Sequence, residues 1–166
     1  MADLAVELGR VLQLGRLTVA SAESCTGGWI GKRITDVPGS SAWFERGFVT
    51  YSNLAKAELL GVDSDTLATH GAVSREVVLE MVAGARARSR ADLAVAVTGV
   101  AGPGGGTDDK PVGSVWIAWQ RRGDVARVER RQFSGDRDNV RRATVQAALA
   151  GLIRTVTGTE PPRYPG

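Results

Sequence analysis

The segment that most constrains the fold of this chain is residues 92–98, which read Asp-Leu-Ala-Val-Ala-Val-Thr. Apolar residues fill it almost without alternation. A strand with one face in water alternates apolar and polar side chains, whereas a strand covered on both faces has no such requirement. Because such strands occupy the middle of sheets that helices cover on both faces, this segment predicts an α/β fold.

Other segments supply the layers that such a strand requires. Apolar residues with helical spacing predict helices, and short apolar runs bounded by turn residues predict strands. The expected helices cover residues 4–15, 26–36, 53–60, 74–89 and 136–155, and the expected strands cover residues 17–21, 47–51, 92–98, 114–120 and 125–133. The last two strands are joined by the short turn Arg-Arg-Gly-Asp and predict an antiparallel hairpin.

This order of elements predicts an α/β fold in the form of a single three-layer α/β/α domain with a mixed, mostly parallel central sheet. We expect this domain to span residues 1–157. The tail, residues 158–166, is rich in proline and is expected to be disordered.

Composition limits the chemistry that is available to the chain. Cys25 is the only cysteine and His70 the only histidine, so we expect no metal site and no cofactor. The sequence has neither a signal peptide nor a segment as long as a membrane span, which predicts a cytoplasmic protein without a membrane partner. The net charge of +3 favours an anionic ligand, and because the arginines are spread over several segments, we expect a small molecule and no nucleic acid.

A short polar segment, Ala-Glu-Ser-Cys-Thr-Gly-Gly at residues 22–28, follows the first expected strand and precedes a helical pattern. This order predicts a strand-to-helix turn in which free backbone N–H groups face a ligand, while Gly27 and Gly28 let the ligand approach closely. Ser24 is then a candidate nucleophile beside oxyanion donors. The alternative is that Ser24 or Thr26 only caps the helix.

A second polar segment, Tyr-Ser-Asn-Leu-Ala-Lys at residues 51–56, follows the next expected strand. It places Asn53 at the N-cap of a helix and Lys56 in the first turn. The helix dipole disfavours a cation there, and partial burial adds to this effect, so the pattern predicts a lowered pKa for Lys56. A lysine with a lowered pKa serves as a general base near neutral pH. Lys56 and Ser24 are therefore a candidate catalytic pair; the alternative for Lys56 is a solvated lysine at a helix end.

Arg137 and Arg141 lie four residues apart at the start of the last expected helix and share one helix face. The planar guanidinium suits a phosphate or carboxylate, which makes this pair a candidate substrate clamp. The alternative is surface pairing with Asp136 and Asp138. The glycine-rich residues 99–113 lack the Gly-Lys-Ser/Thr ending of a nucleotide-triphosphate loop, and we expect them to form a mobile lid that contributes backbone N–H groups.

These motifs occur together with further short segments in a fixed order. The segments are AESCTGG (22–28), PGSSAWF (38–44), YSN followed by Lys56 (51–56), HGAVS (70–74), GVAGP (99–103), KPVG (110–113) and FSGDR (133–137). Taken together, they resemble the CinA C-terminal domain family, the nicotinamide-nucleotide amidohydrolases. The resemblance covers residues 4–156.

The resemblance implies hydrolysis of the carboxamide of nicotinamide mononucleotide (NMN) to nicotinate mononucleotide and ammonia, in pyridine-nucleotide salvage. It implies that Ser24 attacks the carboxamide carbon while neutral Lys56 takes the proton of the Ser24 hydroxyl. Tyr51 then relays this proton to the departing ammonia. Ser41 is the alternative nucleophile, with Ser24 only positioning the substrate.

The resemblance also implies a set of binding groups for this substrate. They are the backbone N–H groups of Cys25, Thr26, Gly27 and Gly28 for the oxyanion, Arg137 and Arg141 with the loop glycines Gly99 and Gly102 for the 5′-phosphate, and Glu23 for the ribose or the amide nitrogen.

Two other functions stay open from the sequence. One is a non-catalytic pyridine-nucleotide sensor that uses the same pocket. The other is a nucleic-acid-associated protein, which the pI near 9.5 and the family's link to competence and DNA damage suggest, although the chain has no helix-turn-helix, RNA-binding signature or basic stripe. For the assembly we expect a homodimer.

Overall fold

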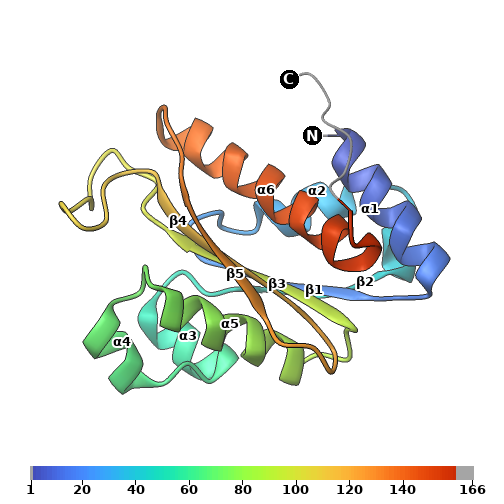
Figure 1. The fold of residues 1–166 in the computed structure, drawn as a ribbon, viewed down its shortest axis with the longest axis horizontal. Helices are drawn as coiled ribbons and strands as arrows, with labels where there is room; N and C mark the ends of the chain where they lie inside the picture. Colours follow the sequence, from blue (N-terminus) through green and yellow to red (C-terminus); the bar gives the residue numbers. More distant parts are fainter. Residues whose placement is uncertain (1, 160–166) are drawn as a thin grey trace.

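The computed structural model describes residues 2–159, with side chains from residue 4 onward. The strands form one sheet in the order β2-β1-β3-β4-β5, and helices cover both faces (Figure 1). The strands are β1 (Val19–Glu23), β2 (Phe44–Val49), β3 (Leu93–Gly99), β4 (Ser114–Arg121) and β5 (Arg127–Gln132). The helices are α1 (Ala2–Gly15), α2 (Trp29–Thr35), α3 (Asn53–Leu60), α4 (Ser64–His70), α5 (Arg75–Ala87) and α6 (Arg137–Thr157), and a 3-10 turn (Ser40–Ala42) precedes β2.

The sheet is mixed, as predicted. β1 pairs in parallel with both β2 and β3, β4 is antiparallel to β3, and β5 is antiparallel to β4. Every strand except β4 therefore runs in the same direction, and β4 with β5 forms the predicted hairpin. The carboxyl ends of β1, β2 and β3 meet at one edge of the sheet, which is where ligands bind in such folds.

Helices α1, α2 and α6 cover one face of the sheet, and α3, α4 and α5 cover the other (Figure 1). β3 is buried on both faces, which confirms the prediction from its apolar run. Leu93, Val95 and Val97 pack in the core under α1 and α6. Ala94 and Ala96 face α5, and because these side chains are small, α5 packs closely against the strand.

Some element boundaries differ from the prediction, each for a local reason. β1 begins at Val19, because the N–H of Leu17 donates to the Leu12 carbonyl at 2.9 Å and closes the end of α1. β2 begins at Phe44, which pairs with Val19, and it ends at Val49, so Tyr51 lies beyond the strand. α2 begins at Trp29, since the two residues before it adopt left-handed φ angles of 60° and 97° that only glycine accepts easily.

The sequence analysis did not predict α4 (Ser64–His70). Asp63 caps this helix by accepting a hydrogen bond from the N–H of Asp65 at 2.7 Å. Leu67 is its one buried residue among those described, so the apolar periodicity that reveals longer helices is missing here. Residues 160–166 of the predicted tail lie outside the described residues. Within residues 2–159, no helix has the length and apolar character needed to cross a membrane.

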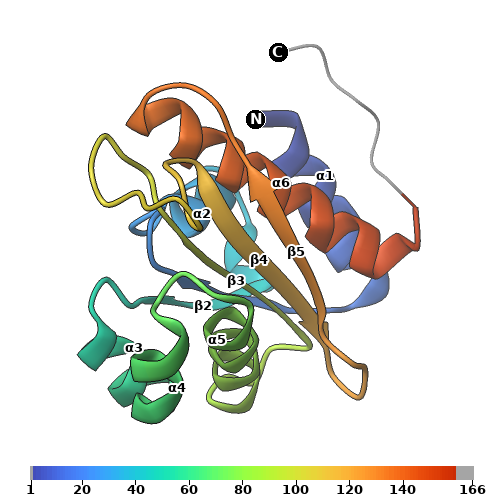
Figure 2. The same ribbon diagram turned by 60° about the vertical axis from the view of Figure 1, so that its left-hand side comes forward.

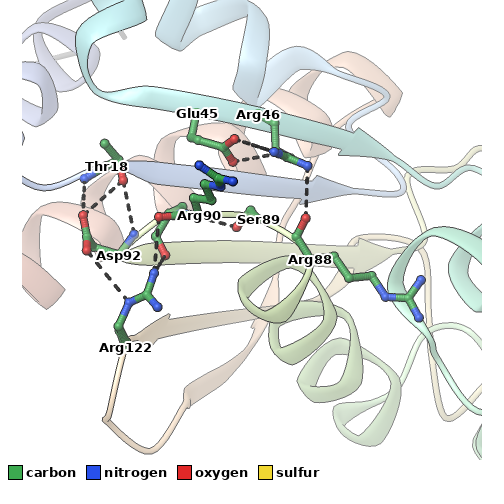
Figure 3. Close-up of polar contacts among 9 residues, drawn as sticks. Thr18, Glu45, Arg46, Arg88, Ser89, Arg90, Asp92 and Arg122 are labelled. Atoms are coloured by element: carbon green, nitrogen blue, oxygen red, sulfur yellow. Dashed lines mark hydrogen bonds and ion pairs between the residues drawn. The ribbon is translucent and has the colours of Figure 1, made fainter.

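The amino ends of β1 and β3 are joined by polar contacts (Figure 3). The Asp92 carboxylate accepts hydrogen bonds from the N–H and hydroxyl of Thr18 at 2.9 and 3.1 Å. Two arginines near these strand ends donate to backbone carbonyls: Arg122 to that of Ala91 at 3.2 Å, and Arg46 to that of Arg88 at 3.1 Å. Side chains at the amino ends of β1 and β3 therefore hold these strand ends together, and the candidate site lies at the carboxyl ends of the parallel strands.

Candidate active site

Lys56 and Ser24 meet at the carboxyl edge of the parallel strands, as predicted. The Lys56 side chain is only 2% exposed, and its Nζ lies 3.1 Å from Ser24 Oγ and 3.1 Å from the Thr50 carbonyl oxygen, to which it donates. Ser24 directly follows β1, and Thr50 directly follows β2; the Thr50 N–H donates to the Glu23 carbonyl at 2.8 Å. Adjacent parallel strands thus bring the hydroxyl and the amine together.

Burial lowers the pKa of the Lys56 amine below its ordinary value of 10.5. Among the described residues, no carboxylate lies within 4.0 Å of this nitrogen, so nothing compensates its charge. The direction of the pKa shift agrees with the prediction, and its largest cause is burial, one of the two predicted causes. Ser52, not Asn53, caps α3 by accepting from the N–H of Ala55, which places Lys56 past the first three residues of the helix. At that position the helix dipole acts more weakly on the amine than the sequence predicts.

Glu23 is a structural residue, which corrects the expectation that it binds the ribose or the amide nitrogen. The carboxylate is 1% exposed and accepts hydrogen bonds from the Thr26 hydroxyl at 2.5 Å and from backbone N–H groups of α2 and its N-cap. These N–H groups belong to Gly28 (3.1 Å), Ile30 (2.9 Å) and Gly31 (2.9 Å). A carboxylate at this position neutralises the positive end of the helix and fixes the turn that carries Ser24.

Removing the Glu23 carboxylate is expected to destabilise the fold. Glu23→Ala leaves buried N–H groups of α2 without acceptors, so we expect the free energy of unfolding to fall by about 3 kcal/mol. Chemical denaturation followed by circular dichroism measures this change. Glu7→Ala is the control, because among the described residues Glu7 pairs with Arg10 of the same helix at the surface and should cost less than about 1 kcal/mol. Equal stability of both variants would contradict the structural role.

Only part of the predicted oxyanion donor set is free. The N–H of Gly27 donates to the Ser24 carbonyl at 3.0 Å, and the N–H of Gly28 is bound by Glu23. Within the described part of the chain, no oxygen atom accepts a hydrogen bond from the N–H of Cys25 or of Thr26. The Cys25 N–H faces the sulfur of its own side chain, and Thr26 is fully buried. The Cys25 thiol itself is buried, which raises its pKa to about 12, so this thiol is not a competing nucleophile.

The two predicted clamp arginines have different surroundings. Arg137 is exposed and donates to the Gly102 carbonyl and to the Tyr51 hydroxyl, both at 2.8 Å. Arg141 reaches the nucleophile turn and donates to the carbonyls of Cys25 at 3.1 Å and Thr26 at 2.9 Å. The alternative, surface pairing with Asp136 and Asp138, is not found for Arg137 or Arg141 among the described contacts.

Tyr51 lies at the mouth of the site, with 60% of the residue exposed. Its hydroxyl accepts from Arg137, and among the described contacts none joins it to Ser24 or Lys56. The relay role expected for Tyr51 therefore lacks a contact with the catalytic pair. The 100–113 loop lies beside the start of α6, where Arg137 binds Gly102 (Figure 2). Gly99 serves packing, because a Cβ there would lie 2.6 Å from Val115 Cγ2 and 2.9 Å from the Ser114 carbonyl oxygen.

Within this chain, Ser41, the alternative nucleophile, lies away from Ser24 and Lys56. Ser41 is exposed in the 3-10 turn before β2, whose first residue pairs with Val19 at the amino end of β1. Ser24 follows the carboxyl end of the same strand. The length of β1 alone separates the two ends by roughly 15 Å. Ser41 therefore lies at the edge of the sheet that faces away from Lys56.

Two contributors to the site had no signal in the sequence. Thr50 acts through its backbone carbonyl, which any residue type would supply, so no motif reveals it. Trp29 lies with its ring 5.2 Å from the Arg141 guanidinium, and both residues line a hollow of about 490 Å³ beside Gly27 and Gly28. This hollow is next to the nucleophile turn and has room for part of a nucleotide.

The family model of the CinA C-terminal domain matches residues 1–156. The chain belongs to the CinA C-terminal domain family. Two relatives carry the name nicotinamide-nucleotide amidohydrolase PncC. The protein from Escherichia coli strain K12 is 55% identical over 150 residues, which cover 90% of this chain and 91% of the relative, and the protein from Pseudomonas putida is 58% identical over 159 residues, which cover 95% and 96%.

Solved structures of CinA-type proteins share the fold. The competence/damage inducible protein CihA from Agrobacterium tumefaciens superposes with a TM-score of 0.90 at 48% identity, covering 92% of this chain and 93% of that one. The competence damage-inducible protein A (ComA) from Klebsiella pneumoniae gives a TM-score of 0.90 at 40% identity, covering 93% and 96%. The family resemblance and the fold class predicted from the sequence are confirmed.

Proposed function

We propose that this member of the CinA C-terminal domain family hydrolyses the carboxamide of NMN and releases nicotinate mononucleotide and ammonia, as a pyridine-nucleotide salvage enzyme. Two lines of support meet in this proposal. Relatives more than half identical over nearly the whole chain are named nicotinamide-nucleotide amidohydrolases. The observation that carries it is the buried Lys56 amine at 3.1 Å from Ser24 Oγ, because amide hydrolysis requires an activated nucleophile.

In the proposed first step, Ser24 Oγ attacks the carboxamide carbon while neutral Lys56 accepts the hydroxyl proton. The tetrahedral intermediate places its negative charge on the former carbonyl oxygen, near the N–H of Cys25, from which no oxygen atom of the described chain accepts a hydrogen bond. The C–N bond then breaks, and Lys56 returns the proton to the leaving nitrogen as ammonia forms. The positively charged pyridinium ring withdraws electrons from the amide and makes its carbon more electrophilic.

In the second step, water attacks the ester on Ser24 and Lys56 accepts a proton from that water. The C–O bond to Ser24 breaks, nicotinate mononucleotide leaves, and the proton on Lys56 returns to the Ser24 oxygen. Lys56 lies within reach of Ser24 Oγ throughout, so one base serves both steps. The Thr50 carbonyl holds the amine in this position by accepting one of its hydrogens.

Incubation of the purified protein with NMN tests the proposal. We expect one ammonia and one nicotinate mononucleotide for each NMN consumed, measured by a coupled ammonia assay and by chromatography. The Ser24→Ala variant is the matched blank. Tight NMN binding by calorimetry without any ammonia would instead identify the non-catalytic sensor.

Arg137 is proposed to hold the 5′-phosphate at the mouth of the site. Arg137→Met removes an exposed cation, so we expect KM for NMN to rise about tenfold with little change in kcat. Nicotinamide riboside lacks the phosphate, and KM for this substrate should change less than about threefold. Initial-rate kinetics with both substrates measures the difference. The same change in KM for both substrates would contradict a phosphate contact.

The homodimer and the cytoplasmic location stay predictions from the sequence. Light scattering coupled to gel filtration measures the mass in solution and tests the first. Fractionation of cells that express the protein tests the second.

A further inference from the structure

The proposed substrate brings a positive charge into a site that is already rich in cations. The pyridinium ring of NMN is cationic. Arg141 and Lys32 line the hollow beside the nucleophile turn, residues 24–28, and Arg137 lies at the mouth of the site. Two kinds of protein group attract a cationic ring, namely a carboxylate and the π face of an aromatic side chain. The question is which of them this site offers.

The carboxylates near the turn are bound to other groups. Glu23 is 1% exposed and accepts hydrogen bonds from N–H groups of α2. Asp138 pairs with Arg142 at 2.8 Å. Asp136 caps α6 by accepting from the N–H of Asn139 at 2.9 Å. Among the described residues of this site, an aromatic ring is therefore the group left to face the pyridinium charge.

Two aromatic side chains lie at the turn, and the structure distinguishes them. The Trp29 ring already has two guanidinium groups of the protein near it, that of Arg141 at 5.2 Å and that of Arg142 at 5.7 Å. None of the described cation–π contacts involves Tyr51. Tyr51 is also 60% exposed, so its ring is open to a ligand. The ring that holds no cation of the protein is the one that is able to receive the cation of the substrate.

Contacts fix the Tyr51 ring beside the turn. A Cβ at Gly27 would lie 3.9 Å from Tyr51 Cε2, so the ring lies close to this glycine. The Tyr51 hydroxyl accepts a hydrogen bond from Arg137 at 2.8 Å. The preceding residue, Thr50, holds the Lys56 amine through its carbonyl oxygen at 3.1 Å. The ring therefore adjoins the nucleophile turn, the segment that holds the base, and the arginine proposed to bind the phosphate.

We propose that Tyr51 is a specificity residue whose ring face receives the cationic pyridinium ring of the substrate. This proposal rests on the proposed amide hydrolysis and names its substrate class, which is carboxamides carried by a positively charged pyridinium ring. The negative face of an aromatic ring attracts such a charge and attracts an uncharged ring far less. This role takes the place of the expected proton relay, for which the Tyr51 hydroxyl has no described contact with Ser24 or Lys56.

Ligand binding by the Ser24→Ala protein tests the proposal, because this background holds NMN without turnover. Tyr51→Leu in this background removes the aromatic ring and keeps an apolar side chain. We expect the dissociation constant of NMN to rise about tenfold. Reduced NMN has the same carboxamide, ribose and phosphate on an uncharged dihydropyridine ring, and its dissociation constant should change less than about threefold. Calorimetry measures both constants, and an equal rise for the two ligands would overturn the proposal.

Tyr51→Phe separates the ring from the hydroxyl. It keeps the ring and deletes the hydrogen bond from Arg137, so we expect the dissociation constant of NMN to stay within about threefold of that of the Ser24→Ala protein. A loss as large as in Tyr51→Leu would assign the effect to the hydroxyl and overturn the proposal. Thermal melting confirms that each variant is folded.

Leu54→Ala is the matched surface control. Leu54 is 67% exposed in α3, three residues after Tyr51, and its removal deletes an exposed apolar side chain from the same segment. We expect unchanged dissociation constants for both ligands. A selective loss of NMN binding equal to that in Tyr51→Leu would show that the ring is not required and would overturn the proposal.

The outcomes separate this inference from the proposed function. Ammonia release by the wild type, with no selective loss of NMN binding in Tyr51→Leu, would overturn the specificity role alone. A selective loss of NMN binding, with no ammonia release by the wild type, would support the ring contact and reject hydrolysis. If Ser24→Ala binds NMN too weakly to measure, KM for NMN and the inhibition constant of reduced NMN in otherwise wild-type protein give the same comparison. Absence of both NMN binding and ammonia release would overturn both.

Discussion

Ser24→Ala is expected to lower the rate of ammonia release from NMN by a factor on the order of 10⁴ or more while the protein stays folded. Among the described residues, Ser24 is the one whose hydroxyl is hydrogen-bonded to Lys56, and losing a nucleophile costs enzymes of this type about this much. NMN binding should persist, because the change removes one oxygen atom. Ammonia release at high enzyme concentration measures the residual rate, and calorimetry measures binding.

Ser41→Ala is the matched control for this experiment. Both substitutions delete a serine hydroxyl next to a strand of the parallel part of the sheet, but Ser41 is exposed at the opposite edge. We expect Ser41→Ala to keep kcat within about twofold, as for other exposed positions remote from a site. Substantial turnover by Ser24→Ala together with an inactive Ser41→Ala would reverse the assignment of the nucleophile.

The sequence predicts the layers of this fold well, because burial on one face or on both faces of an element leaves a pattern of apolar residues. The apolar run in β3 and the turn between β4 and β5 are local signals, and both elements form as predicted. α4 is missed because a helix with a single described buried residue has no apolar stripe. The observed strand boundaries differ from the predicted ones where a contact with a distant segment determines them; β2, for example, begins at Phe44 because Phe44 pairs with Val19.

The site is predicted in part, for a related reason. Ser24 and Lys56 follow from residue types at the ends of neighbouring strands, since the topology brings such ends together. The tasks of Glu23 and Arg141 depend on which backbone groups are already bonded, and sequence does not contain this information. From the sequence, a charged residue near a candidate site is most simply interpreted as a ligand contact. In the folded chain, Glu23 and Arg141 instead bind the backbone of the turn that follows β1.

Lys56→Met is expected to lower kcat about 10³-fold, because it removes the base while keeping an apolar side chain of similar length. Lys56→Arg should not restore activity, since a guanidinium stays protonated and is unable to accept the Ser24 proton. The wild type should lose kcat/KM as the pH falls below the lowered pKa of Lys56, where the amine becomes charged. Rate measurements from pH 5 to about 10 test this acid limb. Full activity of Lys56→Met, or a pH-independent wild type, would contradict the assignment.

The same amine makes stability depend on pH in a direction that follows from its pKa. Between the lowered pKa of folded Lys56 and the ordinary value of 10.5, the unfolded chain binds a proton that the folded chain does not. The free energy of unfolding of the wild type should therefore rise with pH across this interval, relative to Lys56→Met. Urea denaturation of both proteins at neutral pH and near pH 10 measures the difference, in which the other titrating groups cancel. If the wild type gains nothing over Lys56→Met as the pH rises, the amine is charged in the folded protein and is unable to serve as the base.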